Sequence, residues 1–196
     1  MPDDTRLSDS DGVLLIKIAR MAVTEFLSNG KRMKLESEDE KKFSFNSGVF
    51  VTLNNADGLR GCIGFPMPDK KLSHGIIDAA IAAATEDPRF SPVKINELNE
   101  IVFEVTVLTP PVEITITDPM EYLEKIKVGR DGLIISNSFS SGLLLPQVPV
   151  EYGWNVEEFL QHTCEKAGLG RDVWKNEKVK IEKFEGIVYK EETNGS

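Results

Sequence analysis

The chain has few of the residues that build metal sites or disulfide frameworks. Among 196 residues there are two cysteines, Cys62 and Cys164, and two histidines, His74 and His162. These four residues lie far apart in the sequence, so no zinc-site spacing occurs, and two distant cysteines do not make a disulfide framework. We therefore expect no metal, no cofactor and a reducing compartment.

Excess basic charge and long apolar runs are also absent. Lys and Arg number 23 against 32 Asp and Glu, for a net charge of -9. This balance disfavours nucleic acid and anionic membranes as partners, although a local basic cleft stays compatible with it. No apolar run reaches the roughly 20 residues that span a bilayer. The acidic first residues, MPDDTRLSDSDG, are unlike a signal peptide. A soluble, cytoplasmic protein is expected.

Hydrophobic residues make up 40% of the chain, enough for a substantial core. The sequence contains no repeat and no low-complexity segment. We expect a single domain over residues 1–196, with flexible tails at 1–8 and 191–196.

Helices and strands follow from the spacing of apolar residues. Helices are predicted from Asp9 to about Asn29, from Ser73 (as N-cap) to about Glu86, after Asp118-Pro119, and over about 156–167. Strands are predicted at 48–53, 59–65, 101–108, 133–136, 143–145 and 179–190. Residues 31–47 are charged and read as a solvated loop, with a docking segment as the alternative. Hairpins alternate with helices, which indicates an α+β fold with a mainly antiparallel sheet and flanking helices.

The stretch LRGCIGF at 59–65 is the strongest candidate site. Cys62 lies between Gly61 and Gly64 in a segment with strand character. Because side chains alternate along a strand, Arg60 is expected on the same face as Cys62, where its charge would favour the thiolate. Glycine within a strand often marks the close approach of a ligand or of another backbone. A buried, inert cysteine is an equally good interpretation.

Other candidates each have a structural alternative. Arg60 and Arg89 are suited to recognising an anion, but Arg60 could instead pair with a carboxylate such as Glu104, and Asp87 with Arg89 could staple a proline-bounded loop. Glu104 could shuttle protons, and Gln147 could contact a ligand or satisfy backbone groups. His74 is a weak candidate for the base that Cys–His chemistry requires.

Three stretches together are similar to one family: LRGCIGF at 59–65, EDPRFSPV at 86–93 and GLLLPQVPVEYGWNVEEFLQHTCEKAGL at 142–169. The chain resembles the AMMECR protein family over nearly its whole length, and the LRGCIG block is intact. The resemblance implies a larger and a smaller lobe with the LRGCIG stretch near a cleft between them. It implies no established activity. Relatives often occur beside Memo-family and radical-SAM genes, which suggests a shared pathway.

Two hypotheses follow. The first is a small-ligand or catalytic cleft, with Cys62 and Glu104 as candidate catalytic residues. Its candidate ligand-binding residues are Arg60, Gly61, Gly64, Arg89 and Gln147. The second is a non-enzymatic interaction module with a Memo-like or radical-SAM partner, in which the LRGCIG stretch is a rigid docking surface. Neither the substrate nor the partner can be named from the sequence.

Overall fold

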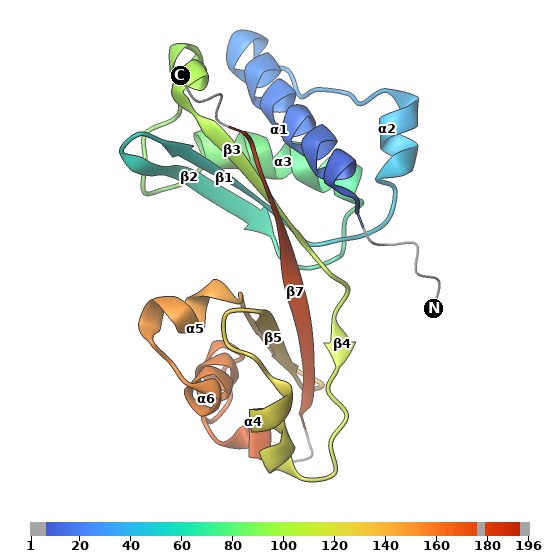
Figure 1. The fold of residues 1–196 in the computed structure, drawn as a ribbon, viewed down its shortest axis with the longest axis vertical. Coiled ribbons are helices and arrows are strands. Elements are labelled where there is room, and N and C mark those ends of the chain that lie inside the picture. The colour runs from blue at the N-terminus through green and yellow to red at the C-terminus, as the bar shows by residue number, and fades with distance from the viewer. Residues whose placement is uncertain (1–6, 176–178, 193–196) are drawn as a thin grey trace. The chain divides into compact units, whose positions relative to one another are not determined.

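The computed structural model of the protein describes residues 7–175 and 179–192 (Figure 1). These residues form two compact units. The first contains the chain up to Val107 together with residues from Ile187 onward, and the second is Leu108–Gly186. Each unit has antiparallel strands, helices and its own hydrophobic core. The predicted α+β class is confirmed, whereas a cleft between two lobes stays a prediction.

The first unit is built on three antiparallel strands in the order β2-β1-β3. They are β1 (Val49–Asn55), β2 (Gly58–Phe65) and β3 (Val102–Leu108). The end of β7 (Lys180–Lys190) follows on the other side of β3. Alternate residues of β1, Val49, Val51 and Leu53, are completely buried. One face of this sheet therefore lies on the core.

Helices α1 (Asp9–Asn29) and α3 (Leu72–Thr85) supply most of that core. Ser8 caps α1, and Gly30 ends it in the left-handed conformation. The predicted cap of α3 is wrong. The helix begins one residue before Ser73, and the buried Ser73 hydroxyl has no hydrogen-bond partner among the residues that the structure describes. Two short helices were also missed, α2 (Ser37–Lys42) in the predicted loop and η1 (Ile95–Glu100).

The second unit is built on β7, which pairs with β4 (Val112–Glu113) on one side and with β5 (Asp131–Ser136) on the other. Strand β6 (Ser141–Leu144) completes the predicted hairpin with β5. Helix α6 (Val156–Lys166), capped by Asn155, packs on this hairpin. Cys164 lies on the buried stripe of α6 and is fully inaccessible.

The remaining helices of the second unit are short. Asp118 caps η2 (Pro119–Glu121), which leads into α4 (Tyr122–Lys125) and confirms the start predicted at Asp118-Pro119. Helix α5 (Gln147–Tyr152) was not predicted, because Pro146 before it and Pro149 within it indicate a chain break. Prolines are tolerated in a first turn, where the missing N–H has no helical partner. Residues 173–175 form η3. No helix in the described part of the chain is both long and apolar enough to cross a membrane.

Candidate functional site

Cys62 lies at the end of a row of side chains that crosses the first unit's sheet. Strand β2 is at the edge, and its Cys62 is paired with Thr52 of β1, which is paired in turn with Glu104 of β3. All three residues are half-buried. They alternate with the buried residues Val51, Leu53, Phe103 and Val105, so they lie on the sheet face opposite the helices. The row combines a thiol, a hydroxyl and a carboxylate.

The thiol and the hydroxyl are in direct contact. The Thr52 hydroxyl donates a hydrogen bond to the Cys62 sulfur at 3.2 Å. The backbone explains this closeness, since the Cys62 N–H points away from β1 and is bonded elsewhere. Thr52 and Cys62 therefore form a non-hydrogen-bonded pair, the kind in which opposite side chains of an antiparallel ladder approach most closely. A donor placed at sulfur can support negative charge that develops there.

The outer edge of β2 is closed by Asp87. Its Oδ2 atom accepts the Cys62 N–H at 2.8 Å, and the side chain is only 3% exposed. Hydrogen bonds from Arg89 hold the pKa of Asp87 well below its ordinary value, although burial opposes this. The backbone bond from Cys62 acts in the same direction as Arg89. A buried carboxylate thus fixes the main chain at the thiol.

Arg89 is the cation associated with Cys62. It bonds both oxygens of Asp87, at 2.9 Å from Nε and 2.7 Å from Nη2, and Nη2 also lies 3.5 Å from the Cys62 carbonyl oxygen. The bond to Asp87 raises the pKa of Arg89, with a smaller contribution from Cys62. The Arg89 side chain is 55% exposed. Arg89 therefore binds Asp87 within the proline-bounded loop, which is the structural alternative considered for these two residues. It still presents hydrogen-bond donors to solvent.

Arg60 is held away from the thiol by a different partner. Its guanidinium contacts Glu97 of η1 through Nε at 2.9 Å and through Nη2 at 3.3 Å, and Nη1 donates to the Ser91 carbonyl. This pairing lowers the pKa of Glu97. Arg60 therefore pairs with Glu97 and not with Glu104.

The pairing of β1 with β2 shows why the alternation of side chains between the two sheet faces does not apply at Arg60. Leu53 is paired with Gly61, but Asn54 is paired with Leu59, so Arg60 has no partner on β1. Such a bulge interrupts the alternation of faces. If the pairing continued from Asn55 and Gly58 without this extra residue, Cys62 would be paired with Val51, and its side chain would face the core.

The two glycines of the motif are required by close packing. A Cβ atom on Gly61 would lie 2.1 Å from the carbonyl oxygen of Ala83 in α3, and one on Gly64 would lie 2.3 Å from the Phe50 ring. The close approach predicted at these glycines is therefore to another backbone and to a neighbouring ring. Their candidate role toward a ligand stays a prediction.

Two further predicted residues belong to other elements. Gln147 is exposed at the start of α5 in the second unit. His74 is exposed and contacts Glu40 at 3.3 Å. The other histidine, His162, stacks on Trp154 with ring centres 3.9 Å apart and bonds Glu165.

Thr52, Asp87 and Glu97 were not among the predicted site residues. Asp87 and Arg89 are two residues apart in a proline-bounded loop, which is a usable signal for their pairing. Thr52 could not be predicted as the partner of Cys62, because pairing residues one by one from the turn between β1 and β2 ignores the bulge at Arg60. Across the described ranges, no group of three or more His, Cys, Asp or Glu side chains is placed to hold a metal ion.

Comparison with known proteins identifies relatives along most of the chain. The AMMECR1 family profile matches residues 16–189. Protein MJ0810 of Methanocaldococcus jannaschii is 50% identical over 187 residues, which cover 94% of this chain and 92% of that protein. Protein PYRAB00100 of Pyrococcus abyssi is 47% identical over 192 residues, covering 95% and 93%.

A solved structure agrees with the fold. The crystal structure of the uncharacterized protein PH0010 from Pyrococcus horikoshii matches with a TM-score of 0.78 and 48% identity, covering 95% of this chain and 94% of that one. With a family match that extends from the first helix to the last strand, the chain belongs to the AMMECR1 family.

Proposed function

We propose that the Cys62 row is a small-ligand site in which the thiol is the reacting group. The observation that supports this most directly is the 3.2 Å contact between the Thr52 hydroxyl and the Cys62 sulfur. It occurs on a half-buried sheet face, with Glu104 next in the row. A structural cysteine would need neither a polar partner nor access to solvent.

The chemistry that suits this row is attack of the sulfur on an electrophilic carbon. A bond forms between the Cys62 sulfur and that carbon, and the leaving group departs with the electron pair of its own bond. The thiol proton passes to Glu104 by way of the Thr52 hydroxyl, which lies between the two residues in the row and turns from the sulfur toward Glu104 as it relays the proton. Arg60 is occupied by Glu97, so of the two roles considered for Glu104 only proton transfer is proposed.

Arg89 is the residue suited to an anionic group of the ligand. Its side chain stays more than half exposed while Asp87 fixes its position. A guanidinium held in this way presents an oriented fork to a carboxylate or phosphate. Gly61, Gly64 and Arg60 would position the strand. Gln147 stays a candidate ligand contact on the ground of the sequence alone.

Selective alkylation tests this proposal. We expect iodoacetamide at neutral pH to modify Cys62 and to spare Cys164, which is fully buried and serves as the internal reference. Peptide mass mapping assigns the adduct. The variant Cys62→Ser should remain folded by circular dichroism and lose the adduct, and Cys164→Ser should retain it. Modification of Cys62 no faster than that of Cys164 would contradict the proposal.

Acyl transfer is measured separately with p-nitrophenyl acetate. A reacting thiol should release nitrophenolate in a burst of about one equivalent, with a mass gain of one acetyl group on Cys62. The burst should be absent in Cys62→Ser and present in Cys164→Ser. Alkylation without a burst would limit the site to ligand binding.

A protein-interaction module is the second candidate. Phe139, at the tip of the β5–β6 hairpin, is 96% exposed, and the Asn137 side chain holds the turn by accepting the backbone N–H groups of Phe139 and Ser140. Phe139 is accessible to a partner on this turn, and it replaces the LRGCIG stretch as the docking surface considered for this candidate. A Memo-family or radical-SAM protein is the partner class to test.

Co-elution on size-exclusion chromatography with such a protein from the same genome should be lost in Phe139→Ser. It should survive in Cys62→Ser, because the thiol is not part of this surface. Absence of any complex with the wild-type chain at micromolar concentration would remove this candidate.

A further inference from the structure

A pocket of about 240 Å³ lies in the first unit, beside the first turns of α3. Its wall is formed by the segment that follows α1, by α2 and by α3, and each of them contributes a charged or polar side chain. Arg32 and Lys34 belong to the segment, Glu40 to α2 and His74 to α3. We call this cavity the charged pocket.

The cationic side of the charged pocket has hydrogen-bond donors to spare. Arg32 is fixed by two contacts, from Nε to Asp78 at 2.8 Å and from Nη2 to the His74 carbonyl oxygen at 3.4 Å, and neither uses its Nη1 atom. Asp78 is shared with Lys70, so it balances only part of the Arg32 charge. Lys34 is exposed, and its ammonium group has no hydrogen bond or ion pair with any residue in the described part of the chain.

The acidic side of the charged pocket is one carboxylate. Glu40 Oε1 lies 3.3 Å from Nε2 of His74, and both side chains are about half exposed. The other oxygen, Oε2, has no hydrogen bond to a residue that the structure describes. Glu40 contacts the ring of His74 and Arg32 contacts its backbone, so groups of opposite charge lie within the span of one residue.

We propose that the charged pocket binds a small zwitterion of the free amino acid class. Arg32 and Lys34 bind its carboxylate, and Glu40 binds its ammonium group. Pairing each ligand charge with an opposite charge offsets the cost of removing that charge from water. A simple anion meets repulsion from Glu40, and a simple cation meets repulsion from the two basic residues.

The size and lining of the charged pocket limit the side chain of the ligand. Pockets for drug-sized ligands have volumes of roughly 300–1,000 Å³, so this one suits a smaller molecule. Of its two aliphatic residues, Ile77 is 1% exposed and Leu35 is partly buried, so little apolar surface is available. A short side chain, as in alanine or serine, meets both limits.

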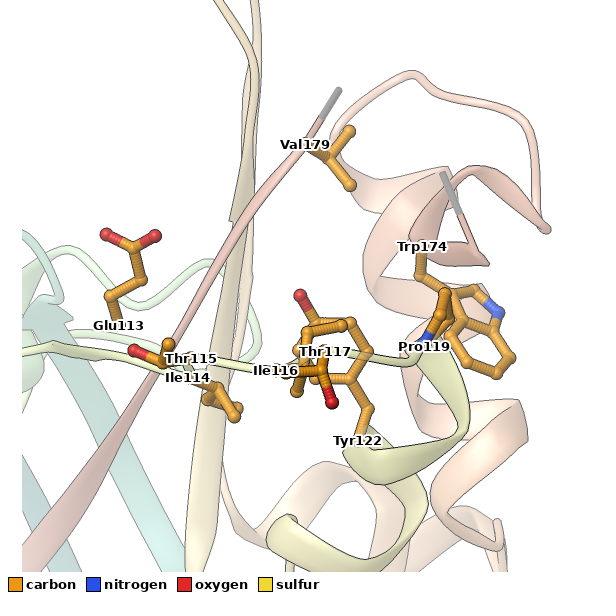
Figure 2. Close-up of a pocket in the computed structure, with 9 residues that line it drawn as sticks. All are labelled: Glu113, Ile114, Thr115, Ile116, Thr117, Pro119, Tyr122, Trp174 and Val179. Carbon is orange, nitrogen blue, oxygen red and sulfur yellow. The ribbon is translucent and has the colours of Figure 1, made fainter. Parts of the chain in front are cut away.

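The second unit has a pocket of similar size, about 230 Å³, that lacks this pairing of charges. Figure 2 shows Tyr122 and Trp174 in its wall, but these residues are 6% and 1% exposed and offer a ligand little aromatic surface. Among the described residues that line it, only Glu113 is charged. The amino acid proposal therefore applies to the charged pocket alone.

Three probes separate the two ligand charges. Propionate is L-alanine without its ammonium group, and ethylamine is L-alanine without its carboxylate. The chain has two histidines, one in each unit, so their ring resonances report two places at once. At constant pH we expect L-alanine to shift the His74 resonance saturably, with a dissociation constant in the millimolar range, and to leave His162 unchanged. Propionate and ethylamine should each bind at least about tenfold more weakly, the usual effect of losing one charged hydrogen bond. Shifts that do not saturate, or equal binding of either single-charge probe, would overturn the proposal.

Matched variants test each side of the charged pocket. Lys34→Met and Glu40→Gln should each weaken L-alanine about tenfold, and Glu40→Gln should also strengthen propionate, because the repulsion is removed. Lys31→Met and Glu38→Gln change exposed residues outside the pocket wall and should have no effect. Circular dichroism checks that each variant is folded. Wild-type affinity for L-alanine in either Lys34→Met or Glu40→Gln would contradict the proposal.

Discussion

The backbone N–H of Cys62 donates a 2.8 Å hydrogen bond to Oδ2 of Asp87, a carboxylate that is almost fully buried at the free edge of β2. Unpaired N–H groups at a sheet edge invite pairing with other chains. Asp87 satisfies one of these groups, and Arg89 balances its charge. The position of the thiol therefore depends on a residue 25 positions away in the sequence.

Replacing Asp87 should destabilise the first unit. Both carboxylate oxygens of Asp87 accept hydrogen bonds, and in Asp87→Asn one of them becomes an NH2 group that cannot. The ion pair with Arg89 is also lost, so we expect the free energy of unfolding to fall by about 2–3 kcal/mol. Urea denaturation measures the change. Glu86→Gln, an exposed neighbour, is the control and should change it by less than about 0.5 kcal/mol. A similar small change in Asp87→Asn would show that the carboxylate is dispensable.

Gly61 should tolerate no side chain. In Gly61→Ala the new methyl group would meet the Ala83 carbonyl oxygen, so α3 and β2 must move apart, at an expected cost of about 2–3 kcal/mol. Gly170→Ala is the matched control, because its Cβ would make an ordinary 3.5 Å contact with Val173. Thermal unfolding of both variants gives the comparison. Equal melting temperatures would contradict the close packing of the motif.

Thr52 should govern the reactivity of the thiol. Thr52→Val keeps the shape of the side chain but removes the donor to sulfur, so we expect the alkylation rate of Cys62 to fall roughly three- to tenfold, equivalent to about 1 kcal/mol. Thr106→Val changes the neighbouring row, where Thr106 is paired with Phe50, and should leave the rate unchanged. Rates are measured in the Cys164→Ser background. A faster or unchanged rate in Thr52→Val would contradict a supporting role for the hydroxyl.

The start of α1 should respond to acid. Asp11 completes the capping box with Ser8, and hydrogen bonds from Lys42 and Ser8 lower its pKa from 3.8 to about 2. Because the folded-state pKa is depressed, this stabilisation is present above the unfolded-state pKa, about 3.9, and is lost as the pH falls toward 2.

The expected effect of Asp11→Asn is therefore a loss of about 1 kcal/mol at pH 7 and little loss at pH 2. Asp9→Asn, in the same turn, is the control and should have a smaller effect at pH 7. Chemical denaturation at the two pH values measures both variants. A loss in Asp11→Asn that does not depend on pH would contradict the role of the charge.

Local chemistry alone was enough to predict the long helices and the class of the fold. Ser8 and Gly30 are cap residues by type, and the apolar spacing between them sets the length of α1. The hairpins likewise follow from turn residues between β-branched runs. Helix α5 escaped prediction because two prolines in a short stretch look like a break, although the first turn of a helix accepts them.

Residue types that act locally are enough to predict Cys62 on a glycine-bearing strand. The surroundings of its sulfur depend on contacts between residues that are distant in the chain. One bulge at Arg60 moves the ladder by a residue, which places Cys62 opposite Thr52 on the half-buried face instead of opposite the core residue Val51. Arg60, the predicted neighbour of the thiol, is bound to Glu97. Asp87 and Arg89, which contact the backbone of Cys62, belong to a loop that is distant in the sequence. Register and long-range pairing depend on which backbone groups find partners across the sheet, and composition and spacing do not specify this.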